Sequence, residues 1–172
     1  ETIAHLENPT VLEIARCFIG VHEEGLNNAG VVVREFQKIV GQAQFEPWCM
    51  SFIQACIALW EARTGKISRF PVSEHCQTAA KAARTRGLAV IDLRAVRESD
   101  IVIWRKEDSL QGHAEIVAQA RRNSSNGEIL QLLTVGGNTG GADEREGDGV
   151  YIKNRNTGIL TGFKPPEFYR ST

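Results

Sequence analysis

Apolar residues recur at two different spacings in the two halves of the chain. In the first half the spacing is helical and glycines stop the runs, so we expect helices over residues 9–20, 31–40, 48–64 and 73–86. From Leu88 onward the period falls to two and short β-rich runs alternate with turn residues, so we expect strands over residues 88–91, 100–104, 113–120, 129–135, 150–153 and 160–163.

This order of elements predicts an α+β fold, because helices precede strands without a linker, a repeat or a low-complexity stretch between them. The strands suit an antiparallel sheet of about five or six strands, with the helical half covering one face. Asn123-Ser-Ser-Asn-Gly127 is expected to join two strands as a hairpin loop, and Ser73 to cap the fourth helix. The helix after Pro47 is apolar almost all round, as expected of a helix buried in the domain.

Composition limits the classes of protein. The chain has 172 residues, of which 42% are hydrophobic and 24% charged, and this composition predicts one domain over residues 1–172. We also expect a monomer. The formal charge of −1 argues against binding nucleic acid through its phosphates. No apolar run approaches the roughly 20 residues that span a bilayer, so we expect no membrane insertion. The start at Glu1, without Met or a signal peptide, leaves open that a leader or tail was removed.

The four cysteines predict neither a metal site nor a firm disulfide framework. Cys17, Cys49, Cys56 and Cys76 form no C-x-x-C pair of the kind that zinc sites prefer, and a chain of this length folds without disulfides. We therefore expect no metal and no cofactor. The acidic stretch at residues 143–148 lacks the alternating ligand order of a calcium loop and favours a solvated loop.

Cys49 is the strongest candidate for chemistry. It follows Pro47-Trp48 in the first turn of the buried helix, where unpaired backbone N–H groups and the helix dipole stabilise a thiolate and can also accept an oxyanion. By itself an apolar-helix cysteine is more often a small core residue, and Cys56, deeper in the same helix, is interpreted that way.

His113 and Asn138 complete a hypothetical triad. His113 opens a strand after Gly112, where one ring nitrogen can face a thiol while a third group holds the other. Asn138 follows the next strand, so its amide can lie close to the histidine. Taken singly, His113 is interpreted as an ordinary histidine and Gly-Gly-Asn-Thr-Gly as a simple turn.

Together these segments resemble the CHAP family, the cysteine- and histidine-dependent amidohydrolases and peptidases that cut peptidoglycan. The resemblance runs in the family's order over nearly the whole chain. Its lead-in is carried by Ala15 to Gly20, Glu23-Glu24-Gly25 and Asn28-Ala29-Gly30-Val31-Val32-Val33. Its further motifs are Pro47-Trp48-Cys49-Met50-Ser51-Phe52-Ile53, Glu98-Ser99-Asp100-Ile101-Val102-Ile103-Trp104, Gly112-His113-Ala114-Glu115-Ile116-Val117, Val135-Gly136-Gly137-Asn138-Thr139 and Gly149-Val150-Tyr151-Ile152-Lys153-Asn154-Arg155. It implies a papain-like α+β domain with Cys49 as nucleophile, His113 as base and then acid, and Asn138 as the orienting group.

Two positions depart from the family's pattern. Glu115 stands where the family prefers a small residue, on the same strand face as His113; it is a second candidate for orienting the histidine, a substrate-amine anchor or a partner for an arginine. Gly136 stands where some relatives have a carboxylate. Trp48 and Gln44 are candidates for the substrate site or oxyanion hole, with Gln42 as a neighbour of Gln44 at similar spacing before Cys49.

The resemblance implies a peptidoglycan hydrolase that cleaves an amide in or next to the stem peptide, acting at the bacterial wall or in the periplasm. A phage endolysin, released by a holin, and an interbacterial amidase effector, matched by an immunity protein, both fit, and either needs a separate route of export or release. A thiol amidase acting on a non-wall amide and a non-catalytic wall-binding module remain as alternatives. The bond cut and the Gram type of the target stay open.

Overall fold

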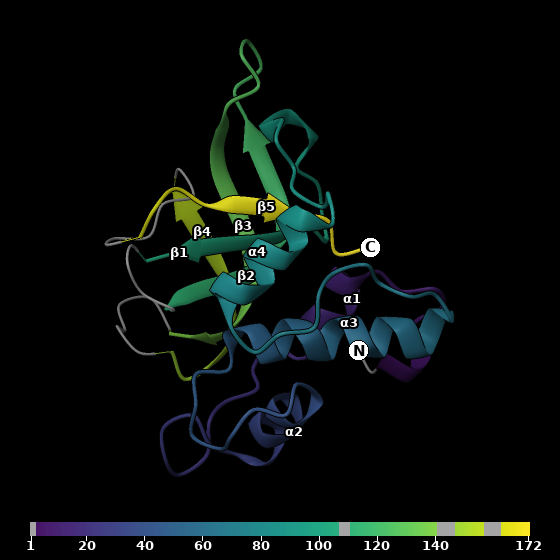
Figure 1. Ribbon diagram of the computed structural model, residues 1–172, viewed down its shortest axis with the longest axis vertical. Coiled ribbons are helices and arrows are strands. Elements are labelled where there is room, and N and C mark those ends of the chain that lie inside the picture. The colour runs from purple at the N-terminus through teal and green to yellow at the C-terminus, as the bar shows by residue number, and fades with distance from the viewer. Residues whose placement is uncertain (1–2, 107–110, 141–146, 157–162) are drawn as a thin grey trace.

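Helices come first and strands second, as the hydrophobic pattern predicts (Figure 1). The computed structural model describes residues 3–106, 111–140, 147–156 and 163–172. Within them the helices are α1 Val11–Arg16, α2 Val31–Ile39, α3 Cys49–Thr64 and α4 Cys76–Thr85, with short 3-10 turns at Ile3–His5 and Leu93–Ala95. The strands are β1 Ile101–Arg105, β2 Gly112–Arg122, β3 Ile129–Thr139, β4 Gly149–Asn156 and β5 Glu167–Tyr169.

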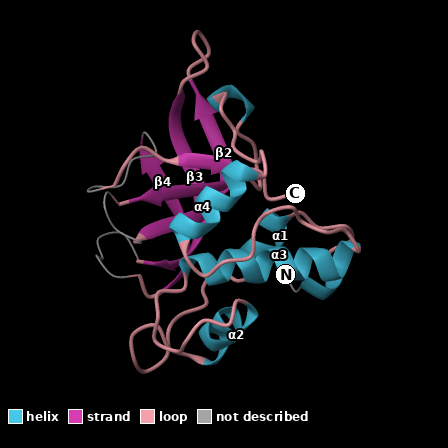
Figure 2. Ribbon diagram, viewed as in Figure 1, coloured by secondary structure: helices cyan, strands magenta, loops and turns pink. Residues whose placement is uncertain are grey.

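The strands form one antiparallel sheet in the order β4-β3-β2-β1-β5, which confirms the α+β class. From β1 to β4 each strand pairs with the next one along the chain. Residues Asn123–Gly127 form the turn between β2 and β3, where the Gly127 N–H donates to the Asn123 carbonyl at 2.9 Å. In Figure 2 the strands group on one side of the molecule, with α1, α2 and α3 gathered at one end of the sheet and α4 lying across it.

Local sequence explains where the helices start and stop. Thr10 caps α1 and forms a capping box with Glu13, whose carboxylate accepts from the Thr10 N–H at 2.7 Å. Gly65 ends α3 in the left-handed conformation that glycine adopts at least cost. Ser73 does not cap α4, contrary to expectation: its hydroxyl instead accepts from the His75 N–H in a tight turn, so the helix begins at Cys76.

The strand predictions fail mainly at the edge of the sheet that β5 forms. Residues 88–91 make only an isolated bridge, Ala89 to Tyr169, and not a full strand. Their partner is β5, a three-residue strand after two prolines that is too short to show a periodicity. Of the strand expected at 160–163, residues 160–162 lie outside the described part of the chain, and Phe163 is not in a strand.

Both faces of the sheet bury apolar side chains, because residues alternate along each strand. On β1, Ile101 and Ile103 join the large core that includes α1, α3 and α4. Val102 and Trp104 point the other way, into a smaller cluster with Leu132 and other residues. The side chains of this second face include the polar groups of the candidate site.

β2 and β3 stop pairing with each other at the end of the sheet where α3 begins. Their ladder stops at the Ile116–Val135 pair, while β2 continues along β1 and β3 continues along β4. The start of α3 packs against both strands at this point (Figure 1). Gly137 permits the close approach, because a Cβ there would lie 2.6 Å from the Cβ of Phe52 and 2.7 Å from the Trp48 ring.

No helix in the described ranges is long and apolar enough to cross a membrane.

We predict that Gly137→Ala destabilises the fold by about 1–3 kcal/mol, because the added methyl overlaps side chains at the buried start of α3. Urea unfolding of the two proteins, followed by circular dichroism, measures the difference. Ile91→Ala is the control, since Ile91 is 88% exposed and its loss should change stability little. Equal stability of Gly137→Ala and the parent chain would contradict the proposed close packing.

Candidate active site

Cys49 is the first residue of α3, and its position gives the sulfur the electrostatics of a helix N-terminus. The first bond inside the helix runs from the Phe52 N–H to the Trp48 carbonyl at 2.9 Å, so the N–H groups of the first turn face outward from the helix start. Cys49 is 6% exposed and lines a pocket of about 440 Å³. The sulfur is therefore both near positive dipoles and reachable.

Trp48 anchors the start of this helix and does not line the pocket. Its indole N–H donates to Glu23 at 2.7 Å, and its ring stacks on Phe36 with the centroids 5.8 Å apart. Because the side chain is fully buried, the expectation that Trp48 contacts substrate or an oxyanion through its side chain is wrong. These contacts hold Trp48, the residue directly before Cys49, in a fixed position.

Asn138 also holds the start of α3 and does not contact His113. With its amide oriented to satisfy both neighbours, it accepts from the Trp48 backbone N–H at 3.0 Å and donates to the Gly147 carbonyl at 2.9 Å. Its φ of 50° turns it out of the regular strand path. The prediction that Asn138 orients the histidine is thus contradicted by this geometry, and its observed contacts are with the backbone beside Cys49.

Glu115 is the group that orients His113. The Nε2 atom of His113 lies 3.0 Å from Oε1 of Glu115, two residues along the same face of β2. The imidazole also stacks on Trp104, its partner across the β1–β2 ladder, with the centroids 6.1 Å apart and the rings inclined by 25°. Because Nε2 is engaged by the carboxylate, Nδ1 is the nitrogen left for the thiol, and the interaction with Cys49 contributes to the raised pKa of His113.

The Glu115 carboxylate is completely buried and is held from two further strands. Arg155 of β4 makes an ion pair with it through two nitrogens, the longer contact being 3.1 Å from Nε to Oε2. Thr134 of β3 donates its hydroxyl to Oε2 at 2.6 Å. The Arg155 guanidinium lies 5.7 Å above the Trp104 ring, in the range of a cation–π contact. A buried carboxylate with this many donors stays ionised.

The ionisation of the three residues follows from these contacts. Burial opposes the charge on Glu115, but His113 and Arg155 outweigh it and lower its pKa to about 2. Burial likewise opposes the imidazolium, yet hydrogen bonds and charges from Cys49 and Glu115 raise the pKa of His113 to about 9. The pKa of Cys49 falls well below its usual value, because the hydrogen bond from Cys76 and the contacts with His113 and the Ala114 N–H together outweigh burial. These shifts favour a thiolate–imidazolium pair.

Cys76 lies directly beside the nucleophile, its sulfur 3.8 Å from that of Cys49. It is the first residue of α4 and is 4% exposed. The hydrogen bond to Cys49, burial, and the negative charge of the neighbouring thiolate raise the pKa of Cys76 well above that of a free cysteine. Cys76 is therefore a neutral thiol that donates to the Cys49 thiolate.

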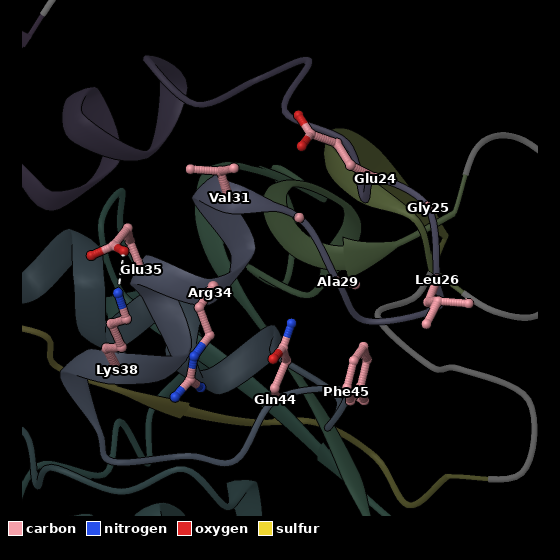
Figure 3. Close-up of a pocket in the computed structure, with 11 residues that line it drawn as sticks. Glu24, Gly25, Leu26, Ala29, Val31, Arg34, Glu35, Lys38, Gln44 and Phe45 are labelled. Carbon is pink, nitrogen blue, oxygen red and sulfur yellow. Dashed lines mark hydrogen bonds and ion pairs between the residues drawn. The ribbon is translucent and has the colours of Figure 1, made fainter.

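Gln42, and not Gln44, lies at the pocket. The Gln42 amide is fixed by two contacts: Nε2 donates to the Pro47 carbonyl at 2.9 Å and Oε1 accepts from Ser51 at 2.5 Å. Its nitrogen has a second hydrogen that, with the Cys49 backbone N–H, suits an oxyanion hole. Gln44 is exposed and lines a different hollow of about 580 Å³ beside Arg34 and Phe45 (Figure 3), so its predicted role is wrong.

Among the described residues, no group of three or more His, Cys, Asp or Glu side chains is arranged to hold a metal ion. Four residues of the acidic stretch at 143–148, those at 143–146, lie outside the described part of the chain. Asp148 accepts a hydrogen bond from Tyr151 at 2.9 Å.

Three contributors to the site escape prediction from sequence. Arg155 lies 40 residues from Glu115, and only the β3–β4 register brings it close. Cys76 is a candidate only for zinc or a disulfide in the sequence pattern, although its place at the start of a helix matches that of Cys49. Gln42 and Gln44 lie at similar spacing before Cys49, and the contact that separates them, a partner hydroxyl in the first turn of α3, is visible only in the structure.

Comparison of the chain with protein-family models, with curated proteins and with solved structures found no significant match. The geometry of the site and the sequence motifs around it are therefore what support a function.

We predict that iodoacetamide near pH 7 labels Cys49 faster than the other three cysteines by at least about tenfold, because only its thiolate is stabilised at a reachable site. Peptide mapping by mass spectrometry measures each rate. Cys56 is the internal control, since burial raises its pKa well above the usual value in the interior of the same helix. Equal rates at Cys49 and Cys56 would contradict an activated thiol.

Proposed function

We propose that this protein is a cysteine-dependent amide hydrolase that cleaves an amide in or next to the stem peptide of peptidoglycan. The observation that carries the proposal is the succession of interactions from Cys49, at the start of a buried helix and beside a pocket, through His113 to Glu115. A nucleophile, a base and an orienting carboxylate in this order match the roles that acyl transfer requires.

In the proposed reaction the Cys49 thiolate attacks the amide carbonyl, and the oxyanion that forms is stabilised by the Cys49 N–H and the Gln42 amide. His113, already protonated, gives its proton to the leaving amine, so the C–N bond breaks and a thioester remains. The neutral imidazole then takes a proton from water, which attacks the thioester and releases the acid and the thiolate. Glu115 keeps the imidazole ring in place throughout.

Two features favour a wall peptide as substrate. The motifs around Cys49 and His113 resemble those of wall hydrolases of the CHAP family. In addition, the pocket lining includes two carboxylates, Glu46 and Glu74, whose charge suits a peptide that carries an amine and disfavours a strongly anionic polymer such as nucleic acid. The enzyme would meet this substrate at the bacterial wall, after release through a holin or delivery as an effector with an immunity partner.

We predict that Cys49→Ala and His113→Ala each lower the rate of turbidity loss of purified sacculi by about 10⁴-fold or more, because each removes a group that the acyl transfer needs. Thermal unfolding of Cys49→Ala should stay close to that of the parent chain, and circular dichroism checks the folding of His113→Ala, in which the buried Glu115 loses one of its partners. Cys17→Ser is the matched control, since Cys17 lies outside the site and a serine hydroxyl keeps its hydrogen bond to the Glu13 carbonyl.

Mass spectrometry of the released muropeptides identifies the bond that is cut. New carboxyl and amino ends in equal amounts are expected, with no change in the glycan strand. Retained lysis in Cys49→Ala would refute the nucleophile, and intact muropeptides with the parent enzyme would refute the wall as substrate.

We also predict the pH dependence of kcat/KM. In the parent enzyme the rate should fall above about pH 9, where His113 loses the proton that the leaving amine needs. In Glu115→Gln this alkaline limb should move to lower pH, toward the ordinary histidine value of about 6.5, because the carboxylate that favours the imidazolium is gone. The rate at pH 7 should fall by roughly 10²- to 10⁴-fold.

The matched control is Glu128→Gln, which removes an exposed carboxylate in the β2–β3 hairpin and should leave the pH profile unchanged. Since Glu115→Gln leaves Arg155 with a neutral partner in a buried place, its folding is checked by circular dichroism at each pH. An unmoved alkaline limb in a folded Glu115→Gln enzyme would show that Glu115 does not set the ionisation of His113.

A further inference from the structure

Cys49 and Cys76 form a pair that the hydrolysis of an amide does not require. Their sulfur atoms are 3.8 Å apart, both line the same pocket, and each is the first residue of its helix. Two helix N-termini thus direct their positive ends at one pair of sulfurs, which favours negative charge there. Neither Cys17 nor Cys56 lies in the pocket lining.

The surroundings hold Cys76 in this place. A Cβ at Gly112 would lie 2.7 Å from the Cβ of Cys76, so the glycine before His113 leaves the room that the second cysteine occupies. A disulfide needs a sulfur–sulfur distance near 2.05 Å, so the two atoms must approach by about 1.8 Å. Both sulfurs lie on the first residue of a helix, so the approach that the bond requires involves two helix starts and no strand.

We propose that Cys76 is a resolving thiol that converts the oxidised Cys49 nucleophile into a reversible Cys49–Cys76 disulfide. A peroxide is the oxidant: the Cys49 thiolate attacks one peroxide oxygen, the O–O bond breaks, and Cys49 becomes a sulfenic acid with release of water after protonation. The Cys76 thiol then attacks the sulfenic sulfur, the S–S bond forms and a second water leaves. The two thiols lose two electrons and two protons in total, and the peroxide is reduced to two waters.

The consequence is a site that oxidation switches off and a thiol restores. A sulfenic acid without a neighbouring thiol proceeds to sulfinic and sulfonic acids, which thiols do not reverse. The proposed S–S bond rests on the geometry of the cysteine pair, whereas the control of activity by this bond rests on the proposed amide hydrolysis. Disulfide formation and hydrolysis can therefore be tested separately.

Intact-mass spectrometry of the full chain, treated with hydrogen peroxide at neutral pH, tests the pair without any substrate. The mass should fall by two hydrogens, peptide mapping should join Cys49 to Cys76, and iodoacetamide labelling of Cys49 should drop by at least about tenfold. Dithiothreitol should restore both the mass and the labelling. In Cys76→Ser the same treatment should add two or three oxygens to Cys49, and dithiothreitol should not remove them.

Cys17→Ser is the matched control and should form the disulfide as the parent chain does. If Cys76→Ser does not fold, Cys76→Ala replaces it, and the mapping of the parent chain decides in either case. A parent chain that gains oxygens as Cys76→Ser does, or a disulfide that joins any other two cysteines, would overturn the proposal. A mapped Cys49–Cys76 bond in a chain that leaves sacculi intact would uphold the redox pair and refute only the wall hydrolase.

Discussion

The structure depends on a carboxylate with no exposure to water. Leaving the charge of Glu115 unpaired in this place would cost several kcal/mol, so the fold has to supply positive charge and hydrogen-bond donors around it. It draws them from three strands: His113 from β2 itself, the Thr134 hydroxyl from β3 and the Arg155 guanidinium from β4. The register of the sheet and the ionisation of the site are therefore one constraint, because a slip of β4 by one residue would turn Arg155 to the other face.

The charges of the site alternate in sign along a series that begins at Arg155, passes through this carboxylate and ends at the pocket. Arg155 is positive, Glu115 negative, His113 positive and Cys49 negative, so the buried set is neutral as a whole. Opposite neighbours explain why the pKa of the acid falls while that of the base rises, and the hydrogen bond from Cys76 together with His113 lowers the pKa of the thiol. A thiolate that is 6% exposed would be unfavourable alone, but as the end of a neutral series, beside a helix N-terminus, it is the stable form.

Sequence reasoning predicted what local patterns encode. The start of α3 just after Pro47 and its end before Gly65 follow from a proline, an apolar stretch and a glycine, and the period of two identified β1 to β4. Cys49 and His113 lie at the start of a helix and of a strand, as the local sequence predicts, while their roles are proposed from the family resemblance and from their contacts. The α+β class followed from the order of these elements.

The sequence does not reveal which way a side chain faces or which distant residues come into contact. Neighbouring strands correctly placed Asn138 near the site, but not which way it faces: the β3–β4 ladder shifts between Gly136 and Thr139, and Asn138 turns toward the backbone of Trp48. Gln42 and Gln44 have the same spacing signal, and only the contacts of Gln42 with Pro47 and Ser51 separate them.

Glu115 and Gly136, the two positions that differ from the pattern of the CHAP family that the motifs resemble, are linked by one physical cause. A Cβ at Gly136 would lie 2.7 Å from Cγ of Glu115, so a side chain at position 136 and a glutamate at position 115 would compete for the same space. The larger residue on β2 thus requires the smaller one on β3. Taking the carboxylate from β2 has an advantage, because residues two apart on one strand share a face whatever the neighbouring strand does. The histidine and its orienting group then move as one unit, and β3 is left to hold the start of α3 through Gly137 and Asn138.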